Sequence, residues 1–150
     1  MKTIPNIYIN IYIDSIVTLS ELGKKIIIYG LNFKPEKVGI GKYTGELAEW
    51  LSKDNDNNLH IITSHPYFPK WELISNGYRT EIVNGVKITR CPLWVPRNPN
   101  GIKRILHYLS FAISSFPIIL GKSFFRPDLI ITIAPSLLCA PNSILLKFLN

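Results

Sequence analysis

Short apolar runs and helix-like periods alternate along the first part of the chain. Residues 25–30 (KIIIYG) form a continuous run that ends in glycine, as a strand buried in a parallel sheet does. A loop is predicted over 31–41, followed by a helix from 42 to about 53, where the apolar residues share one face. Residues 59–63 (LHIIT) form a second strand-like run. Strand, loop, helix and strand make a βαβ unit, which predicts a parallel sheet.

The second half of the chain continues this alternation and inserts a hairpin. Asn84-Gly85 separates two strand-like runs, and this dipeptide suits the type I′ turn of a β-hairpin. A long apolar helix is predicted over 102–120, kinked or ended at Pro117, then a buried strand over 128–134 and a helix over 141–149. The pattern therefore predicts the α/β class. We expect a Rossmann-like parallel sheet with helices on both faces and an inserted β-hairpin, incomplete at the C-terminus because no further strand follows.

Residues 1–23 do not fit that alternation. Isoleucines at every second position from Ile7 to Ile13 predict a strand, which would need a sheet edge to pair with. The alternative is an extension that precedes the domain. We therefore divide the chain into an extension of unknown role, 1–23, and one Rossmann-like domain, 24–150.

Composition excludes two classes of protein, and the charge is unevenly distributed. Of the 150 residues, 47% are hydrophobic and 18% are charged, which excludes a disordered tail. Two cysteines cannot staple a fold of this length. The net charge of +7 comes entirely from 82–150, where eight basic residues accompany one acidic residue. This asymmetry indicates an anionic partner, namely nucleic acid, a phosphate-bearing ligand or a membrane surface; the alternative is an incidental surface bias.

Two uncharged stretches raise the question of a membrane span. The stretch 105–121 is shorter than the roughly 20 apolar residues that a span requires, and 129–146 is interrupted by Pro135 and Pro141. We therefore expect no transmembrane helix. The N-terminus also lacks the basic segment, apolar core and cleavage site of a secretory signal. The expected localisation is cytoplasmic, with reduced thiols.

The strongest candidate for a binding site is the glycine loop that follows the first strand. Ligands of open α/β sheets bind beyond the carboxyl ends of the strands. Gly39, Ile40 and Gly41 allow close approach of the backbone, and the helix that follows directs free N–H groups and its positive dipole end outward. Lys42 adds a full charge. The pattern favours a phosphate or carboxylate ligand; the alternative is a glycine turn that serves strand–helix packing.

Other chemistries have weaker support in the sequence. The glycine loop lacks the third glycine of a dinucleotide fingerprint, and Ser64 and His65 occupy the place of a ribose-binding acid, so a nicotinamide dehydrogenase is disfavoured. The histidines have no metal-ligand spacing and neither cysteine belongs to a CxxC pair, so no metal site is predicted. His65 is the only histidine at the carboxyl end of a strand, either catalytic or, as its surroundings favour, packed in a loop. Glu36, the sole acid of the glycine loop, either orients that loop or binds a sugar hydroxyl.

The long helix also has two interpretations. Its apolar face is wide enough to cover a sheet, which favours a core helix. It is nevertheless apolar nearly all round, and Arg97, Lys103 and Arg104 cluster at its start, a combination that suits contact with an anionic lipid surface. A nucleic-acid partner is disfavoured, because the aromatic residues are arranged as core and loop residues and not as a stacking platform interleaved with Arg and Lys.

Several segments carry a resemblance to a known family. They are NFKPEKVGIGKYTGELAEWL (32–51), SHPYFPKW (64–71), GYRTEIVNGVKITRCPLWVPRNPNGIKRILHYLSFA (77–112) and RPDLIITIAPSLLCAP (126–141). In this order they resemble the amino-terminal half of glycosyltransferase family 4, and within it the colanic acid and exopolysaccharide branch. The resemblance covers residues 25–150.

The resemblance implies a GT-B enzyme with two Rossmann-like domains that face a cleft. It implies that the amino-terminal domain holds a glycan acceptor, often lipid-linked at the inner membrane face, and that the second domain holds most of a nucleotide-diphosphate sugar. It assigns Gly39, Ile40 and Gly41, with Lys42 nearby, to the donor diphosphate and the transferred sugar. It also implies retention of the anomeric configuration, no metal or other cofactor, and a peripheral contact with the inner face of the membrane.

The chain departs from the family pattern at both ends. Residues 1–23 have no counterpart, and the sequence stops at Asn150, before the strand that carries the family's catalytic His or Asp and before the donor-binding domain. The resemblance therefore implies that the catalytic base lies beyond Asn150. We expect a truncated or split enzyme, inactive as this chain alone, because catalysis needs donor and acceptor held together. A separate chain would then supply the donor domain. The alternative function is a non-catalytic membrane-surface or anion-binding module that retains the fold.

Overall fold

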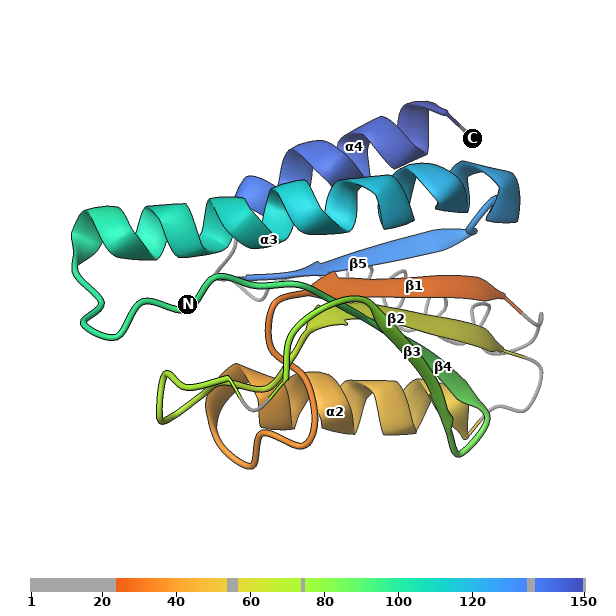
Figure 1. The fold of residues 1–150 in the computed structure, drawn as a ribbon. Coiled ribbons are helices and arrows are strands. Elements are labelled where there is room, and N and C mark those ends of the chain that lie inside the picture. Colours follow the sequence, from red (N-terminus) through yellow and green to blue (C-terminus); the bar gives the residue numbers. More distant parts are fainter. Residues whose placement is uncertain (1–23, 54–56, 74, 135–136, 150) are drawn as a thin grey trace, which may run out of the picture.

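The structure contains the sheet that the sequence predicts, and it has five strands. The computed structural model describes residues 24–53, 57–73, 75–134 and 137–149. The strands follow the order β3-β4-β2-β1-β5 across the sheet (Figure 1). Their bounds are Lys25–Gly30 (β1), Asn58–Ser64 (β2), Arg79–Val83 (β3), Val86–Cys91 (β4) and Leu129–Ile133 (β5). Neighbouring strands are parallel except in the β3–β4 hairpin.

Both ends of the sequence lie outside the described residues. They are the 1–23 extension, for which a strand was one interpretation, and the C-terminal residue Asn150. The domain predicted over 24–150 is therefore described only as far as Leu149. The catalytic base that the family resemblance places beyond Asn150 stays a prediction.

Helices cover both faces of this sheet (Figure 1). Helix α2, Gly39–Ser52, packs on one face, and helices α3, Gly101–Gly121, and α4, Ala140–Phe148, pack on the other. Two short 3₁₀ turns, η1 at Lys122–Phe125 and η2 at Leu137–Cys139, follow α3 and precede α4. The predicted α/β class, with a Rossmann-like sheet and an inserted hairpin, is confirmed.

The predicted start of α2 is wrong, whereas the predicted range of α3, 102–120, agrees with the structure to within one residue at each end. Of the two interpretations of Pro117, the one in which it ends the helix is wrong. Helix α2 begins at Gly39 and not at residue 42, so the last part of the predicted glycine loop is the first turn of the helix. Gly39 has a φ of +61°, a left-handed value that glycine adopts without strain, and this turns the chain into the helix. Helix α3 continues through Pro117 to Gly121. Pro117 and Ile113, four residues earlier, are exposed, so the carbonyl that proline leaves without a partner lies on the exposed side of the helix.

Alternate side chains of the central strands build two cores. The core on the α2 side contains Ile26, Ile28, Phe33, Ala48, Leu59, Ile61 and Ile88. On the opposite side, Tyr29 of β1 joins both helices that cover it. Its hydroxyl lies 2.5 Å from Ser115 Oγ of α3 and accepts a hydrogen bond of 3.0 Å from Asn142 Nδ2 of α4. Burial raises the pKa of Tyr29, so this hydroxyl stays protonated and able to donate.

A chain of polar side chains lies on the α3 face near the amino ends of the strands. His60 of β2 is 2% exposed, and its Nε2 lies 2.8 Å from Thr89 Oγ1 of β4. Thr89 Oγ1 lies 3.3 Å from Thr80 Oγ1 of β3. Burial, followed by the positive charges of Lys122 and Lys87, lowers the pKa of His60 to about 3. The imidazole is therefore neutral at physiological pH.

Replacing His60 with glutamine tests this buried neutral ring. In the unfolded chain a histidine takes up a proton near pH 6.5, whereas folded His60 does so only near pH 3. The unfolded state therefore binds more protons between these values, and the free energy of unfolding falls as the pH drops through that window. Urea unfolding at pH 7.5 and pH 5, in phosphate-free buffer, measures the effect. We expect the wild type to lose more stability than His60→Gln on acidification; equal losses would contradict the assignment.

Candidate functional site

Glu36 joins two loops at the carboxyl ends of the strands. The loop 31–38 follows β1, and the loop 65–78 follows β2. Glu36 Oε1 accepts hydrogen bonds from the backbone N–H groups of Tyr67 (3.2 Å) and Phe68 (3.1 Å). Oε2 accepts a hydrogen bond of 3.0 Å from Asn32 Nδ2. The side chain is buried and both carboxylate oxygens are engaged inside the protein, which agrees with the loop-orienting interpretation of Glu36.

Gly41 brings the first turn of α2 against this carboxylate. A Cβ atom at position 41 would lie 2.6 Å from Glu36 Oε2 and 2.7 Å from Glu36 Cβ, so this approach requires glycine. The N-cap residue Val38 offers no side-chain hydrogen bond, which leaves the first-turn N–H groups without a cap. Lys42 is exposed and forms an i,i+4 ion pair with Glu46, at 3.7 Å. Gly39, Ile40, Gly41 and Lys42 thus lie together on one helix end at the rim of the sheet.

His65 is a packed loop residue in the structure. It is 3% exposed, and both ring nitrogens have partners within its own loop. Nε2 lies 2.8 Å from the Gly77 carbonyl oxygen and donates to it, and the Ser75 hydroxyl donates to Nδ1 over 2.8 Å. Within the described ranges, no three His, Cys, Asp or Glu side chains come together as metal ligands would.

An aromatic cluster beside His65 was not singled out from the sequence. The Trp71 ring lies 5.4 Å from the Tyr67 ring and 5.2 Å from the His107 ring, centroid to centroid, and the Arg104 guanidinium lies 5.7 Å above Trp71. Trp71 has a φ of 56°, a left-handed value that strains a bulky residue. Strain of this kind persists where surrounding contacts impose it, and it concentrates at functional sites. The aromatic and proline run at 66–71, placed directly after a strand, was the available signal.

His107 is the buried member of this cluster. It is fully buried, and its Nδ1 lies 2.6 Å from the Trp94 carbonyl oxygen, to which it donates. Its Nε2 has no hydrogen-bond partner in the described part of the chain. Burial lowers the pKa of His107, so the ring stays neutral among its aromatic neighbours. The hydrogen bond thus joins α3 to the segment that carries Trp94, and the ring contact joins α3 to the loop that carries Trp71.

A hollow of about 590 Å³ opens beside Trp71. It is lined by Lys70, Trp71, Glu72, Leu73, Val95 and Arg97. The structure thus places Arg97 on the hollow and Arg104 over Trp71, and leaves Lys103 exposed in the first turn of α3. Pockets that combine an aromatic face with a few charged groups bind small polar ligands in a defined orientation. An indole face flanked by cations suits a sugar ring that carries phosphate or carboxylate groups.

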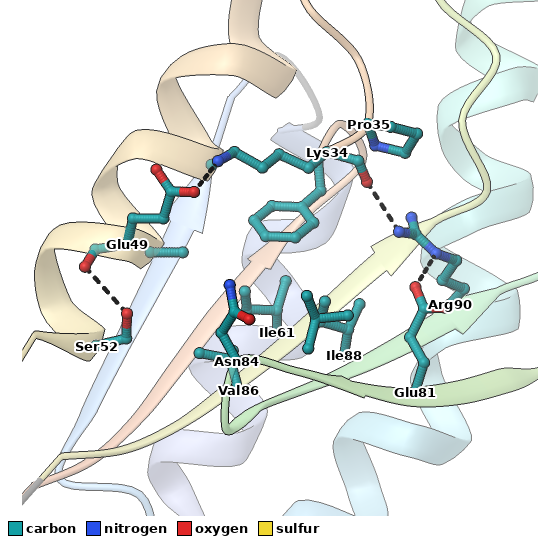
Figure 2. A pocket seen from close by; sticks show the side chains of 14 residues that line it. Lys34, Pro35, Glu49, Ser52, Ile61, Glu81, Asn84, Val86, Ile88 and Arg90 are labelled. Carbon is teal, nitrogen blue, oxygen red and sulfur yellow. Dashed lines mark hydrogen bonds and ion pairs between the residues drawn. The ribbon is translucent and has the colours of Figure 1, made fainter. Parts of the chain in front are cut away.

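A second hollow, of about 250 Å³, lies between α2 and the β3–β4 hairpin (Figure 2). Its floor includes Ile61 and Ile88. One wall carries the ion pair of Lys34 with Glu49, and the other carries Arg90, whose Nε donates to Glu81 Oε1 over 2.8 Å (Figure 2). Arg90 Nη2 also donates to the Lys34 carbonyl oxygen over 2.8 Å. The contacts that frame this hollow therefore also hold the loop 31–38 against the hairpin.

Helix α3 has a core face and an exposed apolar face. Its buried residues are His107, Phe111, Ala112, Ser115 and Ile119. A stripe along the opposite side, which we term the outer stripe, is exposed and consists of Ile102, Ile105, Leu106, Leu109, Ile113, Phe116 and Leu120. The core interpretation is right for one face, and the other face has no cover within the described residues. In the described part of the chain, the helical stretch Gly101–Phe125 has the length and the apolar composition of a membrane-crossing helix, with a mean hydropathy of 1.3. This finding rests on length and composition alone.

The comparison with curated proteins shows which kind of protein this chain is related to. It is 43% identical over 129 residues to WcaI of Escherichia coli, which is described as a colanic acid biosynthesis glycosyl transferase. The chain is a homologue of this glycosyl transferase. The resemblance to colanic acid and exopolysaccharide glycosyltransferases predicted from the sequence is confirmed. The match covers 84% of this chain and 31% of the relative. No protein-family model matches the chain, and no solved structure matches it.

The contact between Gly41 and Glu36 can be tested with a single methyl group. In Gly41→Ala the new Cβ meets Glu36 at 2.6 Å, so the carboxylate must move away from Tyr67 and Phe68. Overpacking of this kind costs about 1–3 kcal/mol of unfolding free energy. The matched control is Gly101→Ala in the first turn of α3, where no atom lies within 4 Å of the new Cβ. Urea unfolding should show a loss for Gly41→Ala only; a Gly41→Ala variant as stable as the control would show that this packing is unimportant.

Proposed function

We propose that this chain is the acceptor-side part of a glycosyltransferase of exopolysaccharide synthesis. The enzyme transfers a sugar from a nucleotide-diphosphate sugar to a lipid-linked or polysaccharide acceptor. The observation that carries the proposal is the 43% identity to WcaI across 84% of this chain. The rim of the sheet supports it, because uncapped helix N–H groups and an aromatic hollow lie at the same end of the domain.

The first turn of α2 is the donor end of the proposed site. When the sugar is transferred, the bond between its anomeric carbon and the diphosphate oxygen breaks, and the departing diphosphate gains negative charge. The uncapped N–H groups of Gly39, Ile40 and Gly41 and the positive end of the helix dipole stabilise such a charge. Lys42 adds a full positive charge one residue further along. Glu36 acts as a positioning residue, because it holds the loop before this turn through the bonds to Tyr67 and Phe68.

The hollow beside Trp71 is the acceptor end of the proposed site. The indole provides an apolar face for a sugar ring, and Lys70 and Arg97 provide charges for a phosphate or carboxylate of the acceptor. Arg104 stacks on Trp71 and supports its position. In this arrangement the acceptor hydroxyl attacks the anomeric carbon as the bond to the departing diphosphate breaks, and its proton passes to the catalytic base that the family resemblance places beyond Asn150. His65 does not take that proton in our proposal, because both of its nitrogens are engaged in the loop.

Titration with inorganic pyrophosphate tests the donor end. We expect the amide resonances of residues 39–42 to shift and the Lys42→Gln variant to bind about two- to fivefold more weakly, as the loss of one exposed charge at a helix N-terminus predicts. Lys53→Gln is the matched control, because Lys53 caps the opposite end of the same helix. Binding that is unchanged in Lys42→Gln, or equally reduced in both variants, would remove the diphosphate from this turn.

A second candidate function is favoured by the outer stripe of α3. Apolar residues along one side of this helix, with Lys103 and Arg104 at its start, fit a helix that lies on an anionic membrane. In this alternative the chain is a non-catalytic membrane-surface module. The same surface is also compatible with the enzyme, which would then be cytoplasmic and peripheral on the inner face of the membrane, where a lipid-linked acceptor is located.

Vesicle binding tests the outer stripe. The chain should bind phosphatidylglycerol vesicles at low salt and dissociate as salt is added. The double variant with Ile105→Gln and Ile113→Gln should bind at least about tenfold more weakly, because each buried isoleucine contributes more than about 1 kcal/mol. The matched control is Ile82→Gln on the hairpin, which is 73% exposed and outside α3. If the wild type does not sediment with anionic vesicles at low salt, the membrane contact is excluded.

A further inference from the structure

A small cavity lies at the end of the sheet opposite the proposed site. It measures about 260 Å³ and is lined by Thr80, Lys87, Thr89, Pro117, Ile118, Gly121 and Lys122. Lys87 lies near the start of β4, which begins at Val86, and Lys122 follows the end of α3 at Gly121. The two lysines therefore lie at the amino ends of the strands and the carboxyl end of the helix, and Thr80 and Thr89 pair with each other further along the hairpin. The proposed transferase site is at the other end of the same elements (Figure 1).

Two lysines on this cavity lack an acidic partner. Among the described residues, the ion pairs are formed by Lys34, Lys42, Arg79 and Arg90, and none involves Lys87 or Lys122. The nearby acid on the hairpin, Glu81, pairs with Arg90 and Arg79. Burial and the charge of Lys87 lower the pKa of Lys122, so the two ammonium groups repel one another. An anion in the cavity would replace this repulsion with two attractions.

Further positive charge and little negative charge surround the pair. Lys122 Nζ lies 5.6 Å from the centroid of the Phe125 ring, and Lys25 Nζ lies 5.7 Å from the same centroid. Asp128 Oδ2 accepts a hydrogen bond of 2.8 Å from the backbone N–H of Lys25. This contact places the Asp128 carboxylate beside the backbone of Lys25. Among the described residues, Asp128 forms no ion pair with Lys87 or Lys122.

A polar side chain connected to His60 also lines this cavity. His60 Nε2 lies 2.8 Å from Thr89 Oγ1, which lies 3.3 Å from Thr80 Oγ1. A threonine hydroxyl can both donate and accept a hydrogen bond. Thr80 is exposed and lines the cavity, so it can donate to a ligand there. Two cations and one hydroxyl match a group that carries several acceptor oxygens and more than one negative charge.

We propose that this cavity is a second anion site, which binds a phosphate group through Lys87, Lys122 and the Thr80 hydroxyl. The cavity holds a phosphate with room to spare, so the group can be free phosphate or the headgroup of an anionic lipid. Leu120 and Phe124, 43% and 92% exposed, lie at the same end of α3 and offer apolar contact to a lipid. This site is independent of the transferase function, because it shares no residue with the rim of the sheet.

Thermal unfolding in inorganic phosphate tests the site. A ligand at ten times its dissociation constant should raise the midpoint of unfolding by on the order of 3 °C for a domain of this size. Sodium chloride at equal ionic strength should not reproduce the rise. Lys87→Gln and Lys122→Gln should each lose most of it. The matched controls Lys53→Gln, at the carboxyl end of α2, and Lys103→Gln, at the start of α3, should retain it in full.

Several outcomes would overturn the site. They are an equal rise in chloride, a rise retained in both Lys87→Gln and Lys122→Gln, or a rise lost in Lys42→Gln, which would assign the phosphate to α2. As a second readout that does not depend on stability, the His60 ring resonances should shift with phosphate in the wild type and not in Lys122→Gln. Phosphatidylglycerol vesicles distinguish the sources. Stronger protection by vesicles than by free phosphate, lost in both cavity variants, identifies a lipid headgroup; protection by phosphate alone identifies a soluble ligand.

Discussion

The buried carboxylate of Glu36 is the contact on which the functional end of this domain depends. A carboxylate removed from water is costly unless hydrogen-bond donors surround it. Here three donors do so, from Asn32 in its own loop and from Tyr67 and Phe68 in the next. Separating the two loops would leave the buried carboxylate without hydrogen-bond partners, which is unfavourable, so this interaction keeps the loops together. Because Gly41 packs on the same carboxylate, the start of α2 is positioned by the same interaction.

Arg90 is a buried positive charge that, like Glu36, is surrounded by hydrogen-bond partners. Its guanidinium is nearly buried, and it donates to the carbonyl oxygens of Ser64 and Lys34 as well as to Glu81. The loop 31–38 therefore has two attachments. Its own Glu36 binds the loop that follows β2, and Arg90 of the hairpin binds its Lys34 carbonyl oxygen. Buried charges with all partners in place favour one conformation over its competitors, because alternative conformations would leave a charge unpaired. A loop held in this way can present backbone N–H groups to a ligand with little further loss of conformational entropy on binding.

The positive charge of the second half has more than one location in the fold. Arg97 and Arg104 lie near Trp71 at the carboxyl ends of the strands, whereas Lys87 and Lys122 lie at the amino ends. Along the sequence this charge is a single excess in one half of the chain, which suggested a single anionic partner. The structure divides it between two ends of the sheet, since β4 and α3 both run from one rim to the other. The outer stripe of α3 connects these two ends on the surface.

The sequence by itself predicted the α/β class, the order of the elements and the hairpin at Asn84-Gly85, because these depend on local periodicity and turn residues. It also predicted the relationship to a glycosyl transferase, because that depends on similarity along the chain. The start of α2 was misplaced because Gly39 and Gly41 are poor helix residues by propensity, and only the Glu36 contact and the left-handed turn at Gly39 explain why the helix begins there. The contacts of Trp71 with Arg104 and His107, the engaged nitrogens of His65 and the lysine pair at 87 and 122 could be found only in the folded chain. Their neighbours are 10 to 36 residues away in sequence, and no local pattern encodes contacts at that separation.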